Sequence, residues 1–228
     1  MTRLAATLGT DVRVQFRNGF YLATMFVVAC SVVLLRWLPP EIAALLLPVV
    51  VLENIVVNTF YFVSASLLLE RDEGTFAAQS VTPLRADEYL ASKVLTLTAL
   101  SLVESLLIAT AVAGLDGRLL VMSIGIALAA VLFCLSGVAL IVNYGSINEF
   151  IMPSVLYTAV LSLPLLGYFG VGAREWYLPH PIQGPLELMR IQTPSTPGGL
   201  AYAIGYPLLW IVPVSLWSRR ALRRVRSR

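Results

Sequence analysis

The sequence predicts an all-α integral membrane protein with six transmembrane helices, because its composition, its hydropathy and the spacing of its apolar runs agree. Of the 228 residues, 58% are hydrophobic and only 13% are charged, whereas a soluble domain carries roughly 25% charged residues. The mean hydropathy is +0.82. Six apolar runs are each about as long as a helix that crosses the roughly 30 Å hydrocarbon core of a bilayer. Residues 1–228 are therefore expected to form a single transmembrane domain.

The first elements are an interfacial helix and two spans. Residues 1–18 interleave apolar side chains such as Leu8 and Val12 with arginines, a pattern typical of an amphipathic helix at the membrane surface. The first span is expected to stop at Pro39. The second is longer than a bilayer requires and contains Pro48, so a tilt or a kink is expected. The six expected spans are residues 20–35, 43–69, 94–113, 119–142, 151–170 and 200–217.

The later spans are joined by two short turns and one long connection. Gly and Asp at 114–117, and Gly, Ser and Asn at 143–150, favour tight turns. Residues 171–198 form a longer polar connection before the last span. Within it, Pro185 is expected to open a short helix. We expect that helix to dip against the membrane surface as an outer gate.

The distribution of Lys and Arg predicts the orientation. Twelve of the 16 lie in the N-terminal segment, the connection after the second span and the C-terminal tail, all on one side of the expected topology. Because basic residues are enriched on the cytoplasmic side, both termini are expected there. The six arginines of the last ten residues directly follow an apolar span. That position favours binding to lipid headgroups over binding to nucleic acid.

Several chemistries lack the residues they need. Cys30 and Cys134 lie inside apolar runs, and His180 is the only histidine, so neither a disulfide nor a metal site is expected. No Ser or Cys nucleophile has a candidate base at a recognisable spacing, which disfavours a membrane enzyme. The phosphate-binding pattern Gly-x-x-x-x-Gly-Lys-Ser/Thr is absent, since Lys93 is the only lysine. The chain is therefore expected to bind neither ATP nor another cofactor.

The charged connection 70–93 is the most informative segment. A short helix is expected over residues 75–81, directly after Gly74. Thr82 is a good N-cap, and Pro83 suits the first position of a second helix. The turn between the two helices must be sharp, because a residue that precedes proline avoids the helical region.

This connection resembles the corresponding part of the ABC type-2 exporter permeases. Those proteins share a Glu-rich cluster and Gly-Thr at the inner end of the second span, then a short coupling helix, Thr-Pro-Leu, a Tyr-Leu pair and a Lys that opens the third span. The segment His-Pro-Ile-Gln-Gly-Pro-Leu-Glu at 180–187 looks particularly like the fluoroquinolone-export permeases of mycobacteria and relatives. The matching positions of the connection are Glu70, Glu73, Gly74, Thr75, Thr82, Pro83, Leu84, Tyr89, Leu90 and Lys93.

The resemblance implies a permease domain of the bacterial cytoplasmic (inner) membrane, whose coupling helix docks on a separate ABC ATPase subunit. Two copies of that ATPase, carrying ATP and Mg, would switch a pair of permeases between inward- and outward-facing states. The second permease would be another copy of this chain or a homologue. The implied cargo is an amphipathic drug-like compound such as a fluoroquinolone. The implied ATPase-docking residues are Glu70, Arg71, Asp72, Glu73, Gly74, Thr75, Phe76, Gln79, Ser80 and Val81.

Four polar residues lie at membrane depth: Glu53, Asn54 and Asn58 in the second span, and Glu104 in the third. An ionisable group there costs roughly 2.5 kcal/mol or more, so it should face protein or a water-filled path. These residues are expected either to line a cargo path or to hydrogen-bond between helices as structural groups. In the alternative of an ion-coupled secondary transporter, the two glutamates would relay protons, although no internal repeat supports it.

Overall fold

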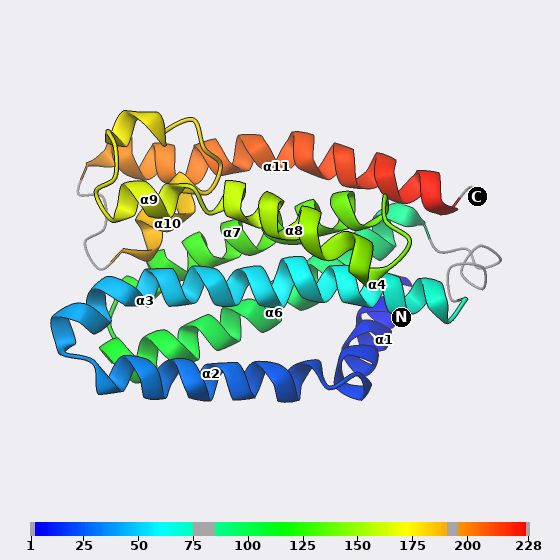
Figure 1. The fold of residues 1–228 in the computed structure, drawn as a ribbon, viewed down its shortest axis with the longest axis horizontal. Coiled ribbons are helices and arrows are strands. Elements are labelled where there is room, and N and C mark those ends of the chain that lie inside the picture. Colours follow the sequence, from blue (N-terminus) through cyan, green and yellow to red (C-terminus); the bar gives the residue numbers. More distant parts are fainter. Residues whose placement is uncertain (1–2, 75–84, 191–195, 227–228) are drawn as a thin grey trace.

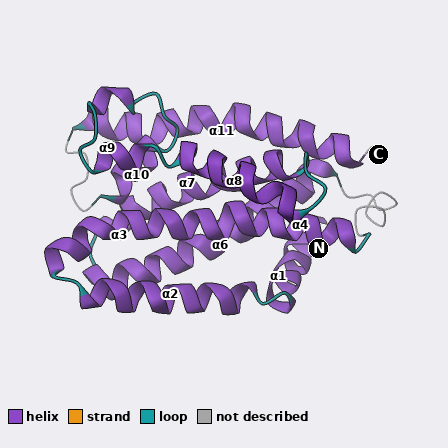
Figure 2. Cartoon of the chain, in the orientation of Figure 1, coloured by secondary structure: helices purple, strands orange, loops and turns teal. Residues whose placement is uncertain are grey.

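The computed structural model describes residues 3–74, 85–190 and 196–226, with side chains through Arg224 in the last range. All secondary structure in these ranges is helical (Figures 1 and 2). The elements are α1 (Arg3–Arg17), α2 (Phe20–Trp37), α3 (Pro40–Ile55), the π-helix η1 (Val56–Tyr61), α4 (Phe62–Asp72), α6 (Ala86–Ala113), α7 (Arg118–Ile141), α8 (Ile147–Leu161), α9 (Pro164–Tyr168), the 3-10 helix η2 (Arg174–Trp176), α10 (Gln183–Met189) and α11 (Pro197–Arg226).

Six helical segments are long and apolar enough to cross a membrane, which confirms the expected all-α, six-span fold class. The segments overlap the expected spans. Their ends differ from the expected ends where polar residues extend a helix beyond its apolar run. The third begins at Ala86 rather than near residue 94, because the Arg85 amide donates to Glu88 Oε2 at 2.9 Å and caps an earlier turn. The six segments are Phe20–Trp37, Pro40–Asp72, Ala86–Ala113, Arg118–Ile141, Ile147–Tyr168 and Pro197–Arg224.

Helix α7 forms the centre of the bundle and is the most buried of the six spans. It contacts α6, α11, α10 and η1. Two glycines allow close approach: a Cβ on Gly137 would lie 2.7 Å from the Phe60 carbonyl oxygen, and one on Gly125 would lie 2.8 Å from the Pro185 carbonyl oxygen. Backbone therefore packs directly on α7 at these points, as small residues permit in membrane bundles.

The two ends of the bundle differ in content. Both chain termini lie at one end, together with α1 and the helix ends that flank residues 75–84 (Figure 1). At this end Arg219 and Arg223 of α11 approach Asp87 of α6 at 3.4 and 3.5 Å. The opposite end carries α9, α10 and the α2–α3 and α6–α7 turns (Figure 1). An even number of spans produces this arrangement.

Helix α1 is amphipathic and has apolar side chains on its exposed side. Its Asp11 and Gln15, one turn apart, are buried at 5% and 2% exposure, whereas Phe16 is 75% exposed. The side that holds Asp11 and Gln15 therefore faces the protein, chiefly α6, whereas Val12 and Phe16 are exposed. A helix at a membrane interface can place such residues among acyl chains.

The second span contains a six-residue π-helix. Residues 56–61 form η1 between α3 and α4, within one continuous segment from Pro40 to Asp72. The expected irregularity of this span is thus found eight residues after Pro48, where the wider turn places Asn58 against α6. Turns of this kind are rare and frequently occur at functional sites.

Helix α10 departs from its expected position. A short helix was expected to begin at Pro185 and to lie against the membrane surface. The helix instead begins at Gln183, and all seven of its residues are buried. It packs between α7 and α11, where a Cβ on Gly184 would lie 2.6 Å from the Ala203 carbonyl oxygen. The Gln-Gly-Pro-Leu segment is therefore part of the protein core at the end of the bundle opposite the chain termini.

Candidate functional site

A buried charge cluster lies where α1, α4 and α6 meet; we call Asp11, Glu70 and Lys93 the lysine cluster. Lys93 Nζ lies 2.7 Å from Asp11 Oδ1 and also contacts Glu70 Oε1. Lys93 is 1% exposed, and the two carboxylates are 5% and 7% exposed. Burial of the three charges is tolerable because they pair, since an unpaired charge in such a place is very costly.

Neighbouring hydroxyls satisfy the remaining atoms of the cluster. Ser92 donates to Asp11 Oδ2 at 2.5 Å, and Tyr89 donates to Glu70 Oε2 at 2.6 Å. Lys93 Nζ also donates to Ser66 Oγ at 3.0 Å. Complete hydrogen bonding of this sort fixes one relative position of the helices.

The lysine cluster flanks the connection that the sequence identified. Glu70 lies in the last turns of α4, just before residues 75–84, and Lys93 lies in the third turn of α6, just after them. Asp11 joins both to α1. A displacement of either end of the connection therefore acts on three helices through one buried contact.

The expected docking residues fall into three groups. Glu70 is buried and both its oxygens are occupied within the lysine cluster, so it holds the joint together and does not present a surface. The next four residues, 71–74, are exposed; Arg71 donates to the Tyr144 carbonyl at 2.9 Å, and Glu73 lies 3.7 Å from Arg17. The remaining five lie outside the described residues: Thr75, Phe76, Gln79, Ser80 and Val81.

Of the four expected intramembrane residues, the structure brings together two. Asn58, in η1, donates to Glu104 Oε2 on α6, and both side chains are buried. Asn54 instead donates to the Val50 carbonyl at 2.9 Å and approaches Ser31 of α2 at 3.4 Å. Glu53 is exposed on the outside of the helix bundle. The four residues therefore face three directions, and Asn58 and Glu104 form a hydrogen bond between helices.

The lysine cluster was the part of the site that sequence reasoning missed. Lys93 was recognised only as the residue that opens the third span, and Asp11 as part of an amphipathic helix. A usable signal was present, because a lysine among apolar residues requires a carboxylate partner at the same depth. The identity of that partner depends on how α1 folds back, which local sequence does not specify.

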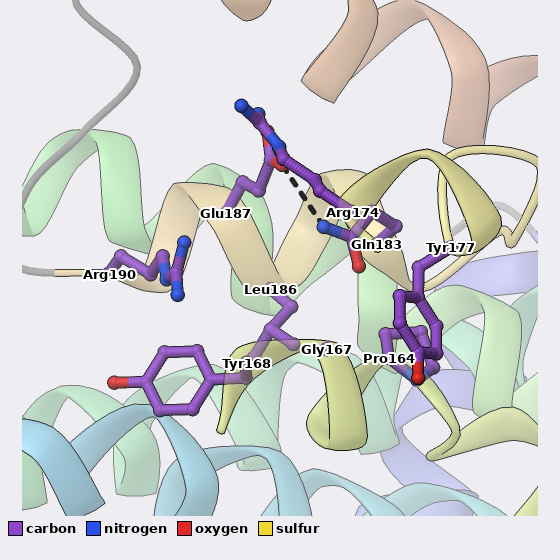
Figure 3. A pocket seen from close by; sticks show the side chains of 9 residues that line it. All are labelled: Pro164, Gly167, Tyr168, Arg174, Tyr177, Gln183, Leu186, Glu187 and Arg190. Atoms are coloured by element: carbon purple, nitrogen blue, oxygen red, sulfur yellow. Dashed lines mark hydrogen bonds and ion pairs between the residues drawn. The ribbon is translucent and has the colours of Figure 1, made fainter. Parts of the chain in front are cut away.

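At the opposite end, α10 holds a second polar cluster. Arg174 of η2 donates to Glu187 Oε1 through Nη2 at 2.7 Å and Nε at 3.2 Å, and Gln183 donates to the same oxygen at 3.0 Å. Figure 3 shows Arg174 and Gln183 meeting at Glu187, with Arg190 beside Tyr168. The enclosed cavity is about 70 Å³, which suits a few waters but not a drug-sized molecule.

His180 lies in the connection between α9 and α10. Its Nδ1 accepts the Ile182 amide at 3.3 Å, and its Nε2 lies 3.1 Å from the Val160 carbonyl oxygen. These contacts suit the neutral ring with the proton on Nε2. Burial lowers the pKa of His180 from 6.5 to about 4, and the contact with the Val160 carbonyl offsets part of this shift. His180 thus has a structural role in the connection before α10.

Comparison with known proteins places this architecture in a family. A family model described as the fluoroquinolones export permease protein family matches residues 2–226. Two fluoroquinolones export permease proteins, from two strains of Mycobacterium tuberculosis, are each 32% identical to the chain over 213 residues. The matched region covers 92% of this chain and 90% of each relative. The six-span, multi-pass membrane protein described above therefore belongs to the fluoroquinolones export permease protein family.

Proposed function

We propose that the chain is the membrane-spanning permease subunit of an ABC exporter, and that it carries an amphipathic drug-like compound such as a fluoroquinolone out of the cell. Two copies of a separate ATPase subunit, which bind the ATP and Mg, dock on the connection 70–93. A second copy of this chain or a homologous permease completes the transport unit. Both termini lie on the cytoplasmic side of the bacterial inner membrane.

The lysine cluster is the observation that carries this proposal. An ATPase outside the membrane can move the helix bundle only if the segment that it binds is rigidly joined to the membrane-spanning helices. Glu70 and Lys93 lie on the two helices that flank residues 75–84, and both are held with Asp11 in one buried network. Force on the connection therefore reaches the second span, the third span and α1 together, as a two-state switch requires.

The distribution of charge supports the orientation. Helix α1, the helix ends that flank residues 75–84 and the C-terminal end of α11 lie at one end of the bundle (Figure 1). Of the 15 Lys and Arg among the described residues, 11 belong to these segments. Because basic residues are retained on the cytoplasmic side, an ATPase in the cytoplasm can reach the connection.

The test is co-purification of the chain with its proposed ABC ATPase subunit. Phe76→Asp and Val81→Asp should each abolish co-purification, because a charge is placed in an apolar docking segment. Leu115→Asp is the control, since Leu115 is 90% exposed in the α6–α7 turn at the other end. Retention of the ATPase by both docking variants would contradict the proposed docking segment.

A transport assay separates this proposal from ion-coupled transport. A change in the ATPase that prevents ATP hydrolysis should stop drug efflux while the proton gradient stays intact. Continued efflux under those conditions would overturn the ABC proposal and favour the secondary transporter. Loss of efflux on collapse of the gradient alone, with ATP maintained, would have the same consequence.

A further inference from the structure

We infer that the groove between α1, α2 and α6 binds amphiphilic ammonium compounds, whose charged nitrogen meets the Glu104 carboxylate. This inference rests on the proposed export function, which it deepens by naming an intramembrane binding site and the class of compound it accepts. It concerns a different part of the chain from the docking segment.

The groove has the size and the composition of a small-molecule site. It encloses about 610 Å³, within the roughly 300–1,000 Å³ typical of ligand pockets. Its walls are mainly aliphatic, and a few polar side chains converge on it. The polar ones are Tyr21, Thr24, Thr96 and Glu104.

Glu104 supplies a charge that is incompletely satisfied. Its Oε2 accepts a hydrogen bond from Asn58, whereas Oε1 has no hydrogen-bond partner among the described residues. Glu104 is only 3% exposed. The nearby Thr24 hydroxyl is within hydrogen-bond reach of Glu104, and it donates to the Tyr21 carbonyl at 3.0 Å. A buried carboxylate oxygen without a donor favours a ligand that brings one.

No cation of the described chain neutralises this carboxylate. Lys93 is on the same helix, but eleven residues away, which at about 1.5 Å per residue is about 16 Å along the axis. Its ammonium is already paired with Asp11 and Glu70. A ligand ammonium therefore provides both the hydrogen-bond donor and the charge that Glu104 lacks, in a setting where charge-assisted bonds are strong.

The rim of the groove is apolar and exposed at membrane depth. Val103 is 58% exposed, Met25 58% and Val12 44%, and all three line the groove. A compound dissolved in the lipid can therefore enter sideways, with its apolar part along the rim and its amine toward Glu104. This geometry selects amphiphiles rather than small hydrophilic cations.

One wall of the groove is connected to the lysine cluster. Gly9 and Val12 of α1 line the groove, and Asp11, between them in sequence, is paired with Lys93. Motion of the docking connection that shifts α1 therefore reshapes the groove. Binding in the membrane and ATP-driven motion at the cytoplasmic end are linked through α1.

The test measures binding by the full chain in phosphatidylcholine nanodiscs, without the ATPase. The probes are a dansyl-labelled long-chain alkylamine and the matching neutral alcohol, followed by fluorescence anisotropy. Glu104→Gln should weaken binding of the amine at least ten-fold and leave the alcohol unchanged. Glu41→Gln removes an exposed carboxylate outside the groove and should change neither. Equal binding of the amine by wild type and Glu104→Gln would overturn the inference.

A second variant controls for a folding defect. Val103→Trp fills the rim from the lipid side and should weaken binding of both probes, with an unchanged elution profile and melting temperature. Retention of both probes by Val103→Trp would exclude this groove as their site. In a further arm, complete displacement of the amine by phosphatidylethanolamine, which is also an amphiphilic ammonium compound, would support the ammonium site but would overturn its assignment to export cargo. Because the ATPase is absent, failure here is separate from failure of the docking test.

Discussion

Lys93 Nζ on α6 lies 2.7 Å from Asp11 Oδ1 on α1, and this contact joins the N-terminal helix to the third span inside the protein. The pair links segments that the chain places far apart. Because Lys93 also contacts Glu70, the lysine cluster couples every helix that borders the proposed docking connection.

Removal of the lysine alone should be strongly destabilising. Lys93→Met leaves Asp11 and Glu70 buried without their cation, and breaking a buried pair in this way costs about 3–5 kcal/mol. The melting temperature of the purified chain in detergent should fall sharply. The triple variant Asp11→Asn, Glu70→Gln, Lys93→Met should recover most of the loss, because it buries no unpaired charge.

The matched control for that series is the exposed pair Arg17–Glu73, whose atoms lie 3.7 Å apart. Arg17→Gln should change stability by less than about 1 kcal/mol. A melting temperature for Lys93→Met equal to that of Arg17→Gln would show that the lysine cluster does not stabilise the fold.

Gly184 should be sensitive to the addition of one methyl group. Its Cβ would lie 2.6 Å from the Ala203 carbonyl oxygen and 3.0 Å from the Ala203 Cα, which belong to the backbone and cannot turn aside. Overpacking of this kind typically costs about 1–3 kcal/mol. Gly184→Ala should therefore lower the melting temperature. Gly205→Ala should not, since nothing lies within 4 Å of a Cβ there. Equal melting temperatures of the two variants would contradict direct α10–α11 packing.

The sequence predicted the fold well because membrane spans have a strong local signal. Each span needs about 20 apolar residues, and composition alone reveals such runs. Helix ends were less predictable: α6 begins at Ala86 because Glu88 caps the Arg85 amide, a side-chain detail within a charged segment. The π-helix of residues 56–61 has no breaker residue of its own, since Pro48 precedes it by a full two turns.

The site was less predictable because its contacts are between distant segments. Asn54 and Asn58 lie four residues apart in the second span, yet the π-helix turns Asn58 to Glu104 and leaves Asn54 near Ser31. Glu53 and Glu104 were both candidates for a group on a cargo path or for a hydrogen bond between helices, and packing leaves the first exposed and the second buried. Only the packing of helices decides which side of a span is covered.

Acid should destabilise the connection before α10 through His180. Its pKa is about 4 in the folded chain and 6.5 ordinarily. The folded state therefore binds fewer protons than the unfolded state between these values. The stabilisation by the neutral ring is complete above pH 6.5 and is lost as the pH falls toward 4. Protonation of Nδ1 would also break the hydrogen bond that this atom now accepts from the Ile182 amide.

The measurement for His180 is the melting temperature between pH 7.5 and 4.5, compared with that of His180→Gln. Glutamine can still donate to the Val160 carbonyl but does not titrate. The decline with acid should be smaller in the variant than in the wild type. Parallel curves would show that the histidine does not contribute to the acid sensitivity.

Arg174 should stabilise the α10 end of the bundle by neutralising a buried carboxylate. Glu187 is 3% exposed and accepts from Arg174 at 2.7 Å and from Gln183 at 3.0 Å, so Arg174→Gln removes its counter-charge. The arginine side chain is itself 65% exposed, so solvent moderates the loss, and we expect about 1–3 kcal/mol. Addition of Glu187→Gln should restore part of it. Hydrogen exchange at residues 183–189 reports the effect locally, with the exposed Glu175→Gln as control. If exchange in Arg174→Gln matched that control, α10 would be held by packing alone, and Gly184 would be its main determinant.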